Sequence, residues 1–389
     1  MPATSQTGPA PIAFFLPSVR GGGAQRVIVN LVQGITERGI PVDVVLATKD
    51  GVFLDHLPAA ARVVDLRAGR LVRSLLPLAR YLRRERPRIL VSSMSHANLI
   101  ALWAASLAGG TTPVMVTVHN TMSESTPDEG GLGARLALPL LRAFYPRASS
   151  VVAVSRGAAD DLARTTGLPR ERIEVIYNPV ITPAILAAAR RAPTHPWFGP
   201  GQPPVILGAG RLTRQKDFPT LVRAFAEVRR GRPARLLILG EGEDRPVLEA
   251  LVAQLGLGDD VGLPGFREDA LACMANSAVF VLSSAWEGLP TVLIEALAAG
   301  TRVVSTDCPS GPREILRDGR LGALVPVGDV SALARAIAEA LESTAEPVPP
   351  DALRPFTRDA AVDNYLQLIE TGHLGPDSAE PAAVHSTAG

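Results

Sequence analysis

The chain has 389 residues, of which 47% are hydrophobic and 20% are charged, so it can fill sizeable cores and is not intrinsically disordered. Two cysteines, Cys273 and Cys308, are too few for a disulfide framework, and no CxxC or Cys/His cluster predicts a metal site. The net charge of +1 divides unevenly. Residues 1–180 hold 20 basic and 13 acidic side chains, and residues 181–389 hold 19 and 25, which predicts an anionic partner for the first half.

Targeting signals are not expected. Residues 1–10 have neither a basic start nor an apolar core, so they do not resemble a secretory signal. The weakly charged window 99–118 is divided by GGTTP into a helix-like half and a strand-like half, which argues against a membrane span. A cytoplasmic protein is the expectation.

The first 180 residues alternate short apolar runs with longer amphipathic stretches such as 24–38 and 156–167. The strand-like runs are residues 12–16, 42–47, 89–92, 114–118, 151–154 and 173–176. This alternation favours a parallel sheet covered by helices.

Prolines then interrupt the pattern, and a Pro-rich linker is predicted at 181–202. The strand-like runs resume at 205–209, 236–239, 279–282, 303–305 and 323–325. The fold class is therefore α/β, with two Rossmann-like domains at 11–180 and 203–356, a crossover helix at 357–373, and flexible tails at 1–10 and 374–389. Ligands of open α/β sheets bind at the carboxyl ends of strands, so the default site is a cleft between the domains.

The loop after the first strand, 17–23, ends in three glycines and opens a helix. Gly22 and Gly23 allow a ligand close to the backbone, and a helix N-terminus favours a phosphate. The GxGxxG pattern of dinucleotide sites is absent. A simple tight turn is the alternative.

The second predicted domain opens with a basic loop that carries Arg211, Arg214 and Lys216 just before a helix. Such cations form a phosphate site, and Lys216 is one of only two lysines in the chain. The alternative is a solvated basic turn. Further on, Glu241 ends a strand between glycines, and Phe266 lies in a turn where it can stack on a base or belong to the core.

Glu287 and Glu295 lie eight residues apart in SAWEGLPTVLIEALAAG, which has no other charge. Pro290 and Thr291 are typical of a helix start, so Glu287 falls on the loop before the helix and Glu295 in its early turns. A carboxylate without a nearby cation needs hydrogen-bond donors, and the two vicinal hydroxyls of a ribose supply them. A structural Glu–Arg pair is the alternative.

The Glu287-GLPTVLI-Glu295 motif resembles the E-x7-E signature of retaining family-4 glycosyltransferases, which have the GT-B fold. GRLTRQKDFPTLVRAF, LGEGEDRPVLE and LPGF resemble the same family across the second domain, and GGGAQRV, VTVHN and IYNP resemble it more loosely across the first.

The resemblance implies a set of roles. Glu295 would bind the nucleotide ribose, and Arg211 and Lys216 would neutralise the leaving diphosphate. The other implied ligands are Glu287 with the backbone near Leu289, Pro290 and Thr291 for the donor sugar, His119 beside that sugar, and Gly22 and Gly23 for the diphosphate and acceptor.

The resemblance also implies retaining transfer with no cofactor or metal, in agreement with the absence of a D-x-D pair. Ala285 and Thr291 stand where many relatives have Arg and Asn, so the donor sugar is less defined. A UDP-linked hexose or N-acetylhexosamine is expected first, and GDP-mannose second.

Residues 70–88 contain seven arginines and one glutamate interleaved with leucines, and 135–147 is a second basic amphipathic stretch. Such segments lie on anionic membranes, where lipid-linked saccharide acceptors of this family are made. A helix with a solvated arginine face and a leucine face in the core is the alternative.

Two other functions stay open: a sugar-nucleotide epimerase of the same fold, and a non-catalytic partner subunit that binds sugar nucleotides. Nucleic acid is not an expected partner, because aromatic residues are only 4% of the chain.

Overall fold

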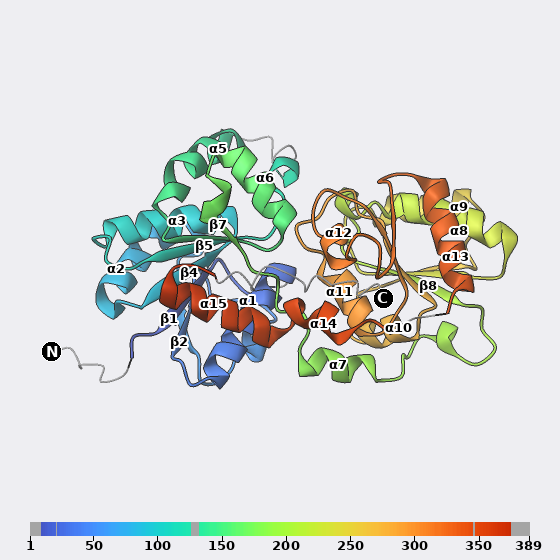
Figure 1. Cartoon of the computed structure of the whole chain (residues 1–389), viewed down its shortest axis with the longest axis horizontal. Coiled ribbons are helices and arrows are strands. Elements are labelled where there is room, and N and C mark those ends of the chain that lie inside the picture. Colours follow the sequence, from blue (N-terminus) through green and yellow to red (C-terminus); the bar gives the residue numbers. More distant parts are fainter. Residues whose placement is uncertain (1–8, 21, 126–131, 345–346, 375–389) are drawn as a thin grey trace, which may run out of the picture. The chain divides into compact units, whose positions relative to one another are not determined.

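The structure is a computed structural model that describes residues 9–20, 22–125, 132–344 and 347–374. Most of both predicted tails, and Gly21 of the glycine loop, lie outside these residues. The chain divides into a first unit, Met1–Pro179 with Thr357–Gly389, and a second unit, Val180–Phe356 (Figure 1).

The first unit contains a seven-stranded parallel sheet in the order β3-β2-β1-β4-β5-β6-β7. Its strands are β1 (Ile12–Leu16), β2 (Val42–Leu46), β3 (Arg62–Asp65), β4 (Ile89–Ser93), β5 (Val114–Val118), β6 (Ser150–Ala153) and β7 (Ile173–Val175). Every residue of β1, β2, β4 and β5 is buried, as expected for strands that are covered on both faces.

Helices flank this sheet (Figure 1). They are α1 (Gly23–Glu37), α2 (Leu75–Glu85), α3 (Ser95–Leu107), α4 (Met122–Ser125), α5 (Leu132–Phe144), α6 (Arg156–Thr166) and α15 (Arg358–Thr371). Local signals set their ends. The Ser155 side chain caps α6 by accepting from Ala158 N, and Gly167 ends that helix with a φ of 76°.

The second unit has a six-stranded parallel sheet in the order β10-β9-β8-β11-β12-β13. Its strands are β8 (Val205–Ala209), β9 (Arg235–Leu239), β10 (Val261–Gly265), β11 (Val279–Leu282), β12 (Val303–Thr306) and β13 (Ala323–Val325). Its helices are α7 (Pro183–Ala189), α8 (Phe218–Gly231), α9 (Arg245–Gln254), α10 (Ala270–Asn276), α11 (Thr291–Ala298), α12 (Pro312–Ile315), α13 (Val330–Glu342) and α14 (Pro350–Leu353). The expected class, two α/β units with parallel sheets, is confirmed.

The residues predicted as a linker, 181–202, contain secondary structure and belong to the second unit. They include α7 and a 3-10 helix, Pro196–Phe198. Thr182 caps α7 by accepting from Ile185 N, and Pro183 follows at the helix start. Trp197 lies under the guanidinium of Arg235, 4.8 Å from the ring centroid. Pro183 and Pro196 therefore each stand at the start of a helix.

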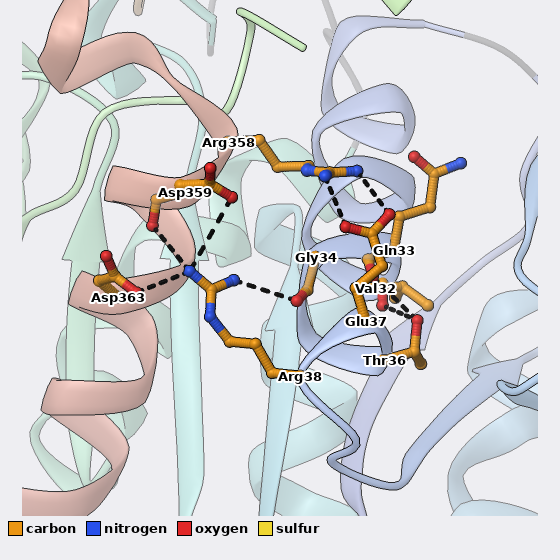
Figure 2. A network of polar contacts seen from close by, with 9 residues as sticks. All are labelled: Val32, Gln33, Gly34, Thr36, Glu37, Arg38, Arg358, Asp359 and Asp363. Atoms are coloured by element: carbon orange, nitrogen blue, oxygen red, sulfur yellow. Dashed lines mark hydrogen bonds and ion pairs between the residues drawn. The ribbon is translucent and has the colours of Figure 1, made fainter. Parts of the chain in front are cut away.

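The last described helix, α15, packs on α1 within the first unit (Figure 2). Arg358 binds Glu37 through two hydrogen bonds of 2.9 and 2.6 Å, and Arg38 lies 2.7 Å from Asp363. Between these pairs the backbone of Gly34 meets Val362 closely, because a Cβ on Gly34 would lie 2.7 Å from Val362 Cγ2. The helices are thus joined by ion pairs around a tight apolar contact.

Within the described ranges, no helix combines the length and apolarity needed to span a bilayer. The same part of the chain contains no group of three or more His, Cys, Asp or Glu side chains placed to hold a metal ion.

Candidate functional site

In both sheets the strand order reverses once, between β1 and β4 and between β8 and β11. The carboxyl ends of strands at such a switch point are where open α/β sheets bind ligands. In the second unit, the loops that leave these ends are residues 210–217, which precede α8, and residues 283–290, which precede α11. The predicted basic loop and the loop of Glu287 are therefore neighbours.

Hydrogen bonds join these two loops directly. Ala285 N donates to Gln215 O at 2.9 Å, and Gln215 Nε2 donates to Trp286 O at 3.0 Å. The Ser283 hydroxyl donates to Lys216 O at 2.7 Å. The main chain at Gln215 and Lys216 is thus held by backbone and side-chain groups of the loop that carries Glu287.

The two charged side chains of these loops form an ion pair. Nζ of Lys216 lies 2.5 Å from Oε1 of Glu287, and the side chains are only 14% and 7% exposed. The same Oε1 accepts from the Ser284 hydroxyl at 2.6 Å. Among the described residues no group donates to Oε2, so one oxygen of the carboxylate keeps its hydrogen-bonding capacity.

Glycines allow the loops to approach one another. A Cβ on Gly240, which follows β9 with a φ of 131°, would lie 1.9 Å from Gly210 O. A Cβ on Gly311, which has a φ of 93°, would lie 2.5 Å from Pro290 Cδ. Only glycine fits at these two positions. Gly240 lies against the loop that carries Lys216, and Gly311 lies against the loop that carries Glu287.

The helix that follows the Glu287 loop begins as predicted. Pro290 is the residue before α11, Thr291 is its first residue, and Leu289 is buried with 6% of its surface exposed. Glu295 is 7% exposed and lies one turn into the helix. The Ser310 hydroxyl donates to Gly288 O at 2.8 Å and so ties this loop to the segment after β12.

Three other predicted residues of the second unit lie on its surface. Arg211 is exposed, and its guanidinium contacts no polar group of the described residues. Phe266 is 80% exposed, so it is not part of the core. Glu241 is bound by Arg245 through hydrogen bonds of 2.9 and 2.7 Å, and these bonds lower the pKa of the carboxyl. Glu241 is therefore already paired, which sequence reasoning did not anticipate.

In the first unit, His119 follows the carboxyl end of β5. Its Nε2 lies 3.2 Å from the hydroxyl of Thr117, and its Nδ1 is enclosed without a hydrogen-bond partner among the described residues. Burial lowers the pKa of His119 to about 4, so the ring is neutral at pH 7. The glycines lie at the first switch point: Gly22 precedes α1 with a φ of 120°, and Gly23 begins it.

Sequence reasoning missed Asp161, which fixes the segment after His119. This buried carboxylate accepts from Met122 N at 2.6 Å and Ser123 N at 3.1 Å. Burial raises its pKa, but the hydrogen bonds from Ser123, Met122 and Arg164 outweigh that effect and lower it overall. No local motif marks this role, because the partners are almost forty residues apart in the chain.

The basic segment 70–88 shows features of both sequence interpretations. It forms a short 3-10 helix, Leu71–Ser74, and then α2, whose Leu78 and Leu82 are fully buried. Val72 and Leu76, however, are 64% and 57% exposed. The arginines at positions 70, 73, 80, 83 and 84 of the same segment are also exposed. The segment thus has a core face and an exposed face that mixes apolar and cationic side chains.

Of the second basic stretch, 135–147, only the side chains from 138 onward lie within the described residues.

Comparison with protein families gives a match in each unit. Residues 21–182 match the model described as Glycosyltransferase Family 4, and residues 196–351 match that described as Glycosyl transferases group 1. The lipopolysaccharide core biosynthesis glycosyltransferase LpsE of Rhizobium meliloti is 31% identical over 363 residues, which cover 90% of this chain and 96% of that protein.

A shorter similarity involves a Campylobacter jejuni enzyme named N-acetylgalactosamine-N,N'-diacetylbacillosaminyl-diphospho-undecaprenol 4-alpha-N-acetylgalactosaminyltransferase. It is 32% identical over 203 residues, which cover 52% of this chain and 53% of that enzyme.

Two solved structures share the fold. Anabaena HepE in complex with UDP and glucose is 21% identical, with a TM-score of 0.74, over 93% of this chain and 100% of that chain. Sucrose-phosphate synthase of Thermosynechococcus elongatus is also 21% identical, with a TM-score of 0.76, over 92% and 98% of the two chains.

Proposed function

This chain belongs to glycosyltransferase family 4 and has the GT-B fold, and from that premise we propose that it transfers a sugar from a nucleotide donor to a saccharide acceptor in polysaccharide or lipopolysaccharide synthesis. The observation that carries the proposal is the buried Lys216–Glu287 ion pair, which lies on the two loops of a switch point. It provides a cation for a phosphate and a carboxylate for sugar hydroxyls at the same place.

The roles in the second unit follow from the geometry of each group. Lys216 has two further N–H groups for the diphosphate, and exposed Arg211 is free to add its guanidinium. Oε2 of Glu287 accepts a hydroxyl of the donor sugar. Glu295 binds the ribose, Phe266 offers an exposed ring for the base, and the backbone at 289–291 contacts the sugar. Glu241 is the weakest of the proposed ligands, because Arg245 occupies both of its oxygens.

The roles in the first unit rest on the family pattern together with local geometry. Gly22 and Gly23 present backbone at the start of α1 to the diphosphate and acceptor. His119 contacts the donor sugar as a neutral imidazole, since burial lowers its pKa to about 4.

We propose a UDP-linked donor and a retaining reaction that needs no metal. HepE, which shares the fold, was solved with UDP and glucose. At the site itself, Lys216 is a cation held in place by Glu287, and exposed Arg211 is a second cation available where negative charge grows on the leaving diphosphate.

A lipid-linked acceptor and peripheral membrane contact complete the proposal. The name of the similar Campylobacter enzyme describes an acceptor on diphospho-undecaprenol. In this chain, Val72 and Leu76 are exposed among arginines, a pattern that suits an anionic membrane surface on the cytoplasmic side. Co-sedimentation with anionic vesicles at low salt tests this part. Wild type should bind, and a variant with Val72→Ser and Leu76→Ser should bind less.

The donor is tested with a panel of UDP- and GDP-linked sugars, by calorimetry and by an assay for released nucleotide, with and without EDTA. Tight binding of one UDP-sugar with slow, EDTA-resistant release of UDP supports the proposal. Conversion of one UDP-sugar into its epimer would favour the epimerase instead, and binding without turnover under any acceptor condition would favour a partner subunit.

A further inference from the structure

Three loops adjoin one another at the carboxyl edge of the first sheet, after the neighbouring strands β1, β2 and β3. They are residues 17–20, 47–53 and 66–70. Backbone hydrogen bonds join each loop to the next. Val19 N donates to Asp50 O at 3.0 Å, and Ala68 N donates to Ala47 O at 2.8 Å. The loops therefore lead, one beside the other, from the edge strand β3 to the switch point between β1 and β4, where such sheets bind ligands.

Basic side chains outnumber acidic ones at this edge. With Asp65, which ends β3, the loops carry four basic residues and two acidic ones: Arg20, Lys49, Arg67 and Arg70, and Asp50 and Asp65. Arg20 is paired, because its Nε lies 2.5 Å from Oδ2 of Asp50. Lys49 and Arg67 are exposed, and their cationic groups contact no polar group within the described part of the chain. Two cations are thus available to a ligand.

A single carboxylate oxygen holds the backbones of these two cations together. Oδ1 of Asp65 accepts from Lys49 N at 3.2 Å and from Arg67 N at 3.0 Å. The two cationic side chains therefore start from neighbouring points on adjacent loops. Arg67 has a left-handed φ of 51°, a conformation that favours glycine and is uncommon for arginine. The protein thus places an arginine, beside an unpaired lysine, where the backbone itself prefers glycine.

Two unpaired cations that start side by side suit a diphosphate, whose negative charge is spread over two phosphoryl groups and which accepts charge-assisted hydrogen bonds from both lysine and arginine. The groups on either side of the cations fit a longer ligand. Beyond Arg67 the chain enters the 3-10 helix Leu71–Ser74, in which Val72 is 64% exposed. Toward the switch point lies the loop of Gly22. The surface thus passes from apolar side chains through cations to the ligand edge of the sheet.

We infer that Lys49 and Arg67 bind the diphosphate group of a lipid-linked saccharide acceptor. The lipid extends past Arg67 toward Val72, and the saccharide extends toward Gly22 and the switch point. This inference rests on the proposed function for the lipid-linked nature of the acceptor. It gives the first unit a phosphate site of its own, in addition to the donor site of the second unit.

Calorimetry with geranyl diphosphate tests the site without knowledge of the acceptor sugar. UDP is kept in excess so that the donor site of the second unit is filled. Wild type should bind geranyl diphosphate, and it should bind geraniol, which lacks the diphosphate, at least about tenfold more weakly. Lys49→Met keeps the length of the side chain but removes the charge, so it should weaken the binding of geranyl diphosphate at least about tenfold. Equal binding of the two probes by wild type would overturn the inference.

Glycine variants separate a ligand contact from a structural role. Arg67→Gly removes the cation but suits the left-handed backbone, so it should weaken the binding of geranyl diphosphate at least about tenfold without lowering the melting temperature. Arg86 provides the matched control. It is also exposed, it has a φ of 45°, and its side chain contacts no polar group of the described residues, but it lies between the end of α2 and the start of β4. Arg86→Gly should bind geranyl diphosphate as wild type does, and equal losses in the two glycine variants would contradict the inference.

An anionic phospholipid head group offers the same phosphate chemistry, and co-sedimentation with anionic vesicles separates it from the acceptor. Lys49→Met and Arg67→Gly should sediment with the vesicles nearly as wild type does, because the exposed side chains of the segment 70–88 remain. If the two variants lose the vesicles but keep geranyl diphosphate, the cations bind the membrane surface and the inference is refuted.

Failure of this inference can be told apart from failure of the proposed function, because the binding of geranyl diphosphate needs neither a sugar nucleotide nor turnover. If no sugar nucleotide binds or reacts while geranyl diphosphate binds through Lys49 and Arg67, the proposed function fails and the phosphate site remains. If sugar transfer occurs but the binding of geranyl diphosphate is the same in wild type and in both variants, the inference alone fails.

Discussion

Nζ of Lys216 and Oε1 of Glu287 are 2.5 Å apart, although 71 residues separate them in the chain. Sequence reasoning gave the two residues separate roles, the lysine on the diphosphate and the glutamate on the sugar. In the protein each is the counter-ion of the other. A buried charge is costly unless it is paired, so the free energy of unfolding and the chemistry of the site both depend on the pair.

Removing one partner of this pair should destabilise the protein. Lys216→Met or Glu287→Gln alone should lower the free energy of unfolding by about 3 kcal/mol, because the remaining charge stays buried. The double variant should regain most of that loss and remain inactive, since it lacks both charges. Urea unfolding and donor turnover measure the two effects. A double variant as unstable as the sum of the single ones would show that the residues do not interact.

Gly240 should be intolerant of a side chain. A Cβ there would lie 1.9 Å from the carbonyl oxygen of Gly210, and the φ of 131° is strained for alanine. Gly240→Ala should displace the loop that carries Lys216, weaken nucleotide binding and lower the melting temperature. Gly258→Ala is the matched control, because a Cβ at Gly258 meets nothing within 4 Å. Equal behaviour of the two variants would contradict the close approach of the loops.

The stability of the protein should fall in mild acid through His119. In the folded protein the pKa of this ring is about 4, and in the unfolded chain it is about 6.5. Between these values the unfolded state binds a proton that the folded state does not, so the free energy of unfolding decreases as the pH falls. At pH 5 the expected loss relative to pH 7.5 is about 2 kcal/mol. His119→Asn should remove that part of the pH dependence, and an identical dependence in both proteins would disprove the assignment.

The contact between α1 and α15 is equally testable. Gly34→Ala gains helix propensity but places a Cβ 2.7 Å from Val362 Cγ2, and Val362 is fully buried. We expect a net loss of about 1–3 kcal/mol in the free energy of unfolding, as is usual for overpacking. Gly34→Ala with Val362→Ala should recover part of it. A higher melting temperature for Gly34→Ala alone would mean that α15 packs more loosely on α1.

The sequence predicted the buried strands well because each is a continuous apolar run, and both sheets follow from them. It missed β3, a four-residue edge strand whose end residues, Arg62 and Asp65, are exposed. It also missed β10, which contains Pro264 and shifts register between Gly262 and Gly265. Short or irregular edge strands lack the periodicity on which such predictions depend.

For the site, the sequence placed individual residues at the ends of strands but not their partners. Glu241 and Arg245 are only four residues apart, but Glu241 precedes α9, which begins at Arg245, so helical spacing did not reveal the pair. The contacts of Lys216 with Glu287 and of Thr117 with Ser93 were not readable, because sheet topology and register bring these residues together across 71 and 24 positions.

The central claim is that the carboxyl edge of the second sheet binds a nucleotide sugar, and titration of UDP by calorimetry tests it most directly. Wild type should bind UDP, and Glu295→Gln should bind it at least about tenfold more weakly through the lost contact to the ribose. Glu249, which pairs with Arg245 on the surface, provides the control: Glu249→Gln should bind UDP as wild type does. If wild type binds neither UDP nor GDP, or if Glu295→Gln binds UDP unchanged, the two glutamates are structural and the site assignment is wrong.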